Sequence, residues 1–125
     1  MNVRTWKRIA EKEVLHYKEH LAFQKGVEDA GGERTERYRT SKRWTDAVDA
    51  VCAHLHRNDP EKERFFRAYC GIGEPRIKRR NDSAVSVAMR LNISTSTLYK
   101  WRGEVLTLVL LAAAQNGVLK PFRKQ

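Results

Sequence analysis

Apolar side chains recur along most of this chain at intervals of three and four residues, the spacing that places them on one face of an α-helix. The longest stripe runs from Val3 to about Glu28 and predicts one amphipathic helix with lysine and glutamate on its other faces. Its members are Val3, Trp6, Ala10, Val14, Tyr17 and Leu21. No run alternates apolar and polar residues between turn residues, so the pattern predicts an all-α fold.

Turn residues divide the rest of the chain. Gly31 and Gly32, followed by the charged stretch ERTERYRTSKR, predict a loop or linker. The expected organisation is therefore an N-terminal helix with a charged linker over residues 1–43 and a small helical domain over residues 44–125.

Four further helices are expected in the second region, at about 44–57, 60–71, 83–91 and 95–116. Asp59 is suited to cap the second of these four, with Pro60 in its first position. Its buried side would carry Phe65, Phe66 and Tyr69.

Residues 83–104 have the spacing of a helix-turn-helix, in which two short helices must bury facing stripes to hold a fixed angle. Ala88 supplies the small residue required where the helices cross. Asn92 occupies the left-handed position of the turn, for which it is the best residue other than glycine. Ser94 is expected to cap the second helix. The apolar anchors are Val87, Leu91, Ile93, Leu98 and Trp101.

With these anchors turned inward, the second helix of the motif presents hydroxyls, a phenol and an ammonium group on its outward face. Such groups on the first turns of a helix can reach base edges in the major groove of DNA. The predicted base-contacting residues are Thr95, Ser96, Tyr99 and Lys100.

Charge favours the same partner. The chain has 25 Lys and Arg against 15 Asp and Glu, which gives a net charge of +10. Such an excess favours a polyanionic partner, first of all double-stranded DNA, with an anionic membrane surface as the lesser option. Residues 59–125 carry 13 basic and 6 acidic groups, against 12 and 9 in residues 1–58. The predicted phosphate contacts are therefore in the second part: Arg76, Lys78, Arg79, Arg80, Ser83, Arg90, Ser94 and Arg102.

Three motifs follow one another in this part: RWTDAVDAVCAHL, EKERFFRAYC and VAMRLNISTSTLYKWRGEVL, the last with a tyrosine and a tryptophan flanking Lys100. In this order the segment from Trp44 to Phe122 resembles the RinA and ArpU type of phage late-gene transcription regulators, which are similar in turn to the DNA-binding region four of sigma factors. The resemblance implies a phage-encoded activator at a late promoter, with the helix from Thr95 as its reader. The insertion PRIKRR departs from the pattern, and the N-terminal helix has only a loose counterpart.

Other hypotheses remain open. The polar face of the hairpin could simply be solvated. A small terminase subunit, also a short basic phage protein with a helix-turn-helix, would form a ring of eight or more copies, whereas one or two copies favour a regulator. A module that binds RNA polymerase without DNA would give no salt-dependent mobility shift of duplex DNA. The host polymerase is also a possible partner of a regulator that does bind DNA.

The run VLTLVLLAAAQNGVL is apolar nearly all round its expected helix. One small domain leaves part of such a helix in water unless another element covers it. The cover is either the N-terminal helix or a second copy in a two-fold dimer, and the pattern does not decide between them.

No side chains in the sequence assemble a nucleophile, a base and an orienting group, so neither an enzyme nor a cofactor is expected. HYKEH places His16 and His20 at a zinc-compatible spacing on the expected helix, but Tyr17 replaces the glutamate of the metalloprotease motif, and no metal site is predicted. The carboxylates of the same helix are expected to be solvated partners of nearby lysines: Glu11, Glu13 and Glu19.

Targeting signals are also weak. The opening MNVRTWKRIAEKE is charged where a signal peptide would be apolar, and the run from Val105 to Ala114 is about half the roughly 20 residues that span a bilayer. Cys52 and Cys70 fit buried, reduced thiols. A DNA-associated protein in the cytoplasm of a bacterial host, with no membrane partner, is therefore expected.

Overall fold

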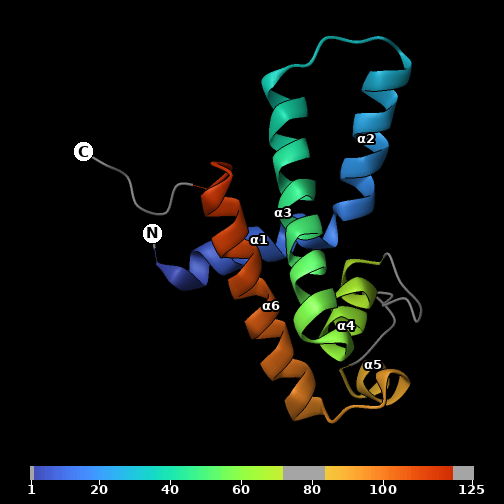
Figure 1. The fold of residues 1–125 in the computed structure, drawn as a ribbon, viewed down its shortest axis with the longest axis vertical. Coiled ribbons are helices and arrows are strands. Elements are labelled where there is room, and N and C mark those ends of the chain that lie inside the picture. Colours follow the sequence, from blue (N-terminus) through green and yellow to red (C-terminus); the bar gives the residue numbers. More distant parts are fainter. Residues whose placement is uncertain (1, 72–83, 120–125) are drawn as a thin grey trace.

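The computed structural model describes residues 2–71 and 84–119, which form six α-helices and no strand (Figure 1). The all-α prediction is confirmed for this part of the chain. The helices are α1 (Val3–Leu15), α2 (Tyr17–Asp29), α3 (Glu36–Asn58), α4 (Pro60–Cys70), α5 (Ala84–Leu91) and α6 (Thr95–Gln115). None of these described helices combines the length and apolar character needed to cross a bilayer.

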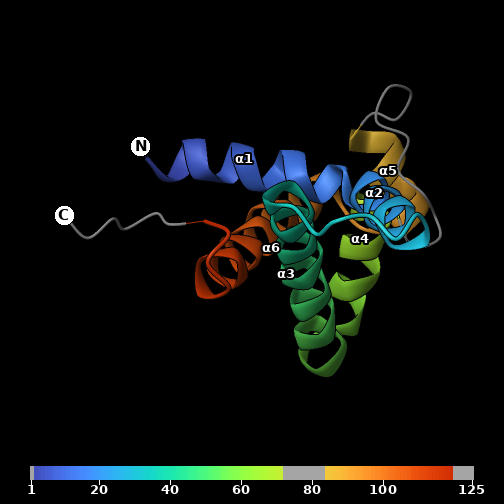
Figure 2. The same cartoon turned by 90° about the horizontal axis from the view of Figure 1, so that it is seen from above.

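All six helices contribute buried side chains to one hydrophobic core. α2 and α3 form an antiparallel pair, α6 packs against α3, and α1 crosses α6 (Figures 1 and 2). α4 and α5 lie at the end of the molecule where α6 begins (Figure 1). The boundary predicted after residue 43 falls within α3, and residues on both sides of it share the core.

The single N-terminal helix predicted from Val3 to about Glu28 is instead two helices that meet at His16. The backbone of His16 has φ −101° and ψ 20°, and its Nδ1–H donates to the carbonyl oxygen of Lys12 at 2.7 Å. A straight helix over these residues would be about 40 Å long and could follow only one direction. The break lets α1 cross α6 while α2 packs along α3. The apolar stripe continues through the break, which is why its spacing did not reveal it.

Most of the stretch predicted to be a charged loop is helical, because α3 begins at Glu36. Thr35 caps α3 by accepting a hydrogen bond from the amide of Tyr38 at 3.3 Å. The buried Tyr38 donates its hydroxyl to Glu28 of α2, and Ser41 one turn later is also buried. The prediction was wrong because the buried side of this segment carries hydroxyl groups rather than aliphatic side chains.

The remaining helices agree closely with prediction. Asp59 accepts a hydrogen bond from the amide of Lys62 at 3.2 Å, and Pro60 opens α4. Gly71 ends α4 with φ 77°, a left-handed conformation that glycine adopts without a clashing Cβ. The predicted start of α5 at Ser83 lies outside the described residues.

The apolar length of α6 is covered largely within one chain. Val105, Val109 and Ala113 are fully buried, and α6 packs against α1, α3 and α4. Leu111, by contrast, is 57% exposed. A second copy is therefore not needed to cover the core side of this helix.

Both cysteines are unpaired and buried, as predicted. Burial raises the pKa of the Cys52 thiol to about 11, so that this thiol is protonated at neutral pH. Burial also raises the pKa of Cys70 above its ordinary value. Neither group has the exposed thiolate of a reactive cysteine.

Val109→Ala and Leu111→Ala test the orientation of α6. The two positions are only two residues apart, and both variants introduce alanine, a good helix former. Val109→Ala should lower the free energy of unfolding by roughly 2 to 3 kcal/mol, because it removes apolar atoms from a fully packed site. Leu111→Ala should change it by less than about 0.5 kcal/mol. Urea unfolding measures both; equal losses would mean that the helix is rotated.

Candidate nucleic-acid interface

The connection between α5 and α6 is a tight turn of three residues. Asn92 has φ 57°, and it alone among the described residues other than glycine has a positive φ. The amide of Ile93 donates to the carbonyl of Ala88 at 2.9 Å, which closes the end of α5. Ser94 then caps α6 by accepting a hydrogen bond from the amide of Thr97 at 3.1 Å. The predicted roles of Asn92 and Ser94 in the backbone are confirmed.

The apolar anchors of this pair of helices face the core. Val87, Ala88, Leu91 and Leu98 are buried, and Ile93 and Trp101 are partly buried against the core. The ring of Trp101 meets that of Phe65 edge to face, with 6.0 Å between centroids. These contacts set how α6 lies on the domain.

The predicted base-contacting residues lie on the opposite side of α6. Ser96 and Lys100 are exposed, Tyr99 is 55% exposed, and Thr95 is intermediate. Ser94 and Ser96 place their hydroxyl oxygens 3.1 Å apart, so that the first turn carries a local hydroxyl cluster. Among the described residues no carboxylate forms an ion pair with Lys100. A tyrosine, a lysine and a serine are thus available to an external partner.

The predicted phosphate contacts divide into two groups. Five of them lie outside the described residues: Arg76, Lys78, Arg79, Arg80 and Ser83. The described ones are Arg90, exposed near the end of α5, Ser94, which is engaged in its cap, and Arg102 on α6. Arg102 already has an anionic partner within the fold.

That partner is Glu11 of α1, a residue expected to be a solvated partner of lysine. Its Oε2 atom lies 2.9 Å from Nε and 2.8 Å from Nη2 of Arg102, and it also accepts the hydroxyl hydrogen of Tyr69 on α4. Burial, and then the bond to Glu11, raise the pKa of Tyr69 above its ordinary value. Glu11 therefore joins α1, α4 and α6, and a phosphate at Arg102 would compete with this ion pair.

The structure adds a feature that the sequence analysis did not identify. An open groove of about 560 Å³ lies between the N-terminal half of α1 and the first turns of α6. Arg4, Lys7 and Arg8 line it from α1, while Tyr99 and Arg102 line it from α6. The sequence signal was the i, i+3, i+4 spacing of three cations with no acidic residue in the first turn of the helix.

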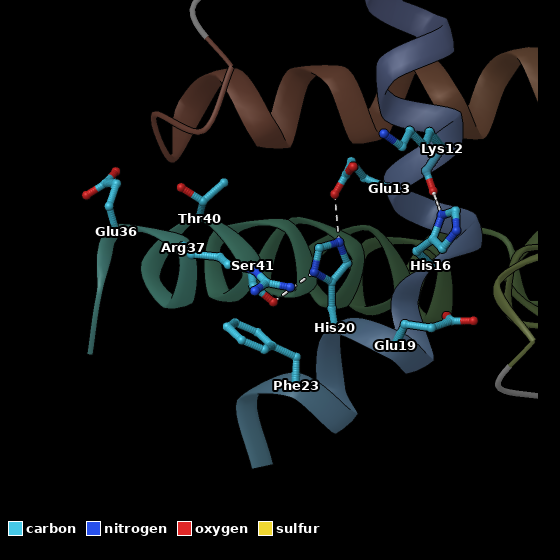
Figure 3. Close-up of a pocket in the computed structure, with 10 residues that line it drawn as sticks. All are labelled: Lys12, Glu13, His16, Glu19, His20, Phe23, Glu36, Arg37, Thr40 and Ser41. Carbon is cyan, nitrogen blue, oxygen red and sulfur yellow. Dashed lines mark hydrogen bonds and ion pairs between the residues drawn. The ribbon is translucent and has the colours of Figure 1, made fainter. Parts of the chain in front are cut away.

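A second cavity, of about 440 Å³, lies between α1, α2 and α3 (Figure 3). His20 links its walls: Nε2–H donates to Glu13 at 2.6 Å, and Nδ1 accepts from the hydroxyl of Ser41 at 2.8 Å. Gln24 donates to the same Ser41 oxygen at 3.0 Å and to Thr45 at 3.2 Å. The carboxylate of Glu13 is thus held by histidine rather than by a solvated lysine.

Serine, histidine and carboxylate in this order are the components of an activated nucleophile. Ser41 is buried in the interior of α3, however, where backbone amides are bonded within the helix and cannot form an oxyanion hole. The chain of bonds instead connects α1, α2 and α3. His16 is bonded to the carbonyl of Lys12 and His20 to Glu13 and Ser41. The described residues hold no cluster of three or more side chains suited to a metal ion.

No protein-family model matches the sequence, and the searches of curated proteins and of solved structures return no significant match.

The link between Glu13 and His20 predicts a pH-dependent stability. The hydrogen bond from His20 lowers the pKa of Glu13 below its ordinary value of 4.5. A lowered folded-state pKa stabilises the fold above the unfolded value, and this contribution is lost as pH falls through the folded value. Glu13→Gln should cost roughly 1 kcal/mol at pH 7 and progressively less below pH 4.5.

Urea unfolding of both proteins at pH 7 and pH 3 measures this difference. Glu19→Gln is the matched control, because Glu19 lines the same cavity but is exposed. A loss for Glu13→Gln that is as large at pH 3 as at pH 7 would contradict the assignment.

Proposed function

We propose that this protein binds double-stranded DNA in a sequence-dependent manner, with the first turns of α6 in the major groove. Ser96, Tyr99 and Lys100 contact base edges, with Thr95 at the start of the same face. In this proposal α5 and its turn hold α6 at a fixed angle, and basic side chains around it contact the phosphate backbone.

The observation that carries the proposal is the division of α6 into two faces over its first two turns. Leu98 is buried and Trp101 packs on the core, while Tyr99 and Lys100 between them are exposed. This is the arrangement that a reading helix needs, because its position must be set by packing while its polar groups stay accessible. The net charge of +10 supports a polyanionic partner.

Within this class we propose a transcription regulator of phage origin, an activator of late genes, rather than an enzyme. Its support is the resemblance of the segment from Trp44 to Phe122 and the absence of an oxyanion hole at the Ser41 cluster. Cover of α6 within one chain favours assemblies of one or two copies. A ring of eight or more copies would favour a small terminase subunit instead.

The proposal is tested by mobility shift of duplex DNA with the full chain, followed by selection of bound fragments from a random library. A recurring sequence and an affinity that falls steeply with salt are expected. No shift of any duplex at low salt would overturn DNA binding.

Lys100→Ala should reduce the ratio of affinities for selected and random duplexes by about 5- to 160-fold, because one base contact contributes roughly 1 to 3 kcal/mol of discrimination. Lys18→Ala on α2 is the matched control: it removes the same charge from an exposed position, and α2 lies away from the start of α6 (Figure 1). Fluorescence anisotropy with both duplexes measures the ratio, and an equal change in the two variants would remove Lys100 from the reading face.

A further inference from the structure

The groove between α1 and α6 carries a strong positive charge. Its cationic lining residues are Arg4, Lys7, Arg8 and Arg102, and Glu11 is its one acidic lining residue. Because Glu11 is already paired with Arg102, the charge of the three α1 cations is left unbalanced. This places an anion-attracting surface directly beside Tyr99 of the reading helix.

The three α1 cations have no ionic partner within the described part of the chain. Some basic side chains elsewhere do have one: Lys42 pairs with Asp46 at 3.2 Å, and Arg67 with Glu63 at 3.0 Å. No carboxylate of residues 2–71 or 84–119 forms an ion pair with Arg4, Lys7 or Arg8. Their charges are therefore available to a partner outside the fold.

Their position in α1 also opposes local stability. The N-terminus of a helix carries a partial positive charge, so acidic residues stabilise its first turns and basic residues destabilise them. α1 has no acidic residue in its first turn and three basic residues within its first six. Basic residues at the end of a helix where they are locally unfavourable are typical of a binding site.

Gly103 gives the groove its open floor. Glycine is among the least favourable residues inside a helix. A Cβ atom at position 103 would have no other atom within 4 Å. Packing therefore does not require glycine at this point in α6. Its absent side chain keeps the groove accessible to a bulky ligand.

We infer that this groove is a binding site for the DNA phosphate backbone, with Arg4, Lys7 and Arg8 as its cations. The inference rests on the proposed function, to which it adds a role for α1. In this arrangement the phosphates of the strand next to the bases read by α6 lie against α1, and Tyr99 lies at the edge of both surfaces. α1 thus contributes affinity that does not depend on sequence.

The test compares the wild-type chain with the triple variant Arg4→Gln, Lys7→Gln and Arg8→Gln. Each phosphate contact contributes about 0.9 to the slope of log affinity against log salt concentration, so the triple variant should lower the slope by about 2 to 3. Its preference for the selected duplex over a random one should stay within about twofold of wild type, because phosphate contacts carry little sequence information.

The matched control is Lys18→Gln, Arg43→Gln and Arg57→Gln, which removes the same charge from exposed positions outside the groove. A slope equal to that of this control would overturn the inference and leave DNA binding in place. No salt-dependent binding by the wild-type chain would overturn both.

Gly103→Leu supplies a second, independent readout. Leucine should raise the thermal midpoint, because it favours the helix and its Cβ would have no atom within 4 Å, yet it should weaken duplex binding at least 10-fold by narrowing the groove. A Gly103→Leu protein that binds as tightly as wild type would contradict a phosphate strand in this groove.

Discussion

The carboxylate of Glu11 is the point at which three helices are joined. It lies on α1 and accepts hydrogen bonds from Arg102 of α6 and from the hydroxyl of Tyr69 of α4. The ring of Tyr69 stacks on Phe65, which in turn meets Trp101 edge to face, so the polar contact lies on an aromatic cluster. Charge-assisted bonds in such partly buried surroundings are stronger than exposed ones. They hold α1 across α6, and the groove between these two helices exists because of that crossing.

A second polar network joins α2 to α3. Gln24, Ser41 and Thr45 are buried between α2 and α3, and each takes part in a hydrogen bond there. Buried polar groups are costly unless they are bonded, so a network whose members are all bonded favours one register of the two helices. His20 extends this network to Glu13 on α1. The helical pair α2 and α3 is thereby connected to the part of the fold that carries the groove.

These two networks give the proposed interface a consistent physical basis. In the proposal, recognition of bases depends on a few polar groups on α6, and affinity depends on cations of other elements. Specificity requires that α6 be held rigidly, and apolar anchors together with the Glu11 contacts provide this. Affinity requires unpaired positive charge, which α1 carries at a helix end where it is locally unfavourable.

The sequence by itself determined the features that depend on short-range chemistry: the helical class, the caps at Asp59 and Ser94, the left-handed turn at Asn92, and the exposure of Tyr99 and Lys100. Each follows from steric or hydrogen-bonding preferences within a few residues. Only the tertiary structure decided the break at His16, the helical start of α3 and the pairing of Glu11 with Arg102, residues 91 positions apart. Apolar periodicity does not report polar contacts between distant segments, and those contacts decide where α1 lies and therefore which cations lie beside α6.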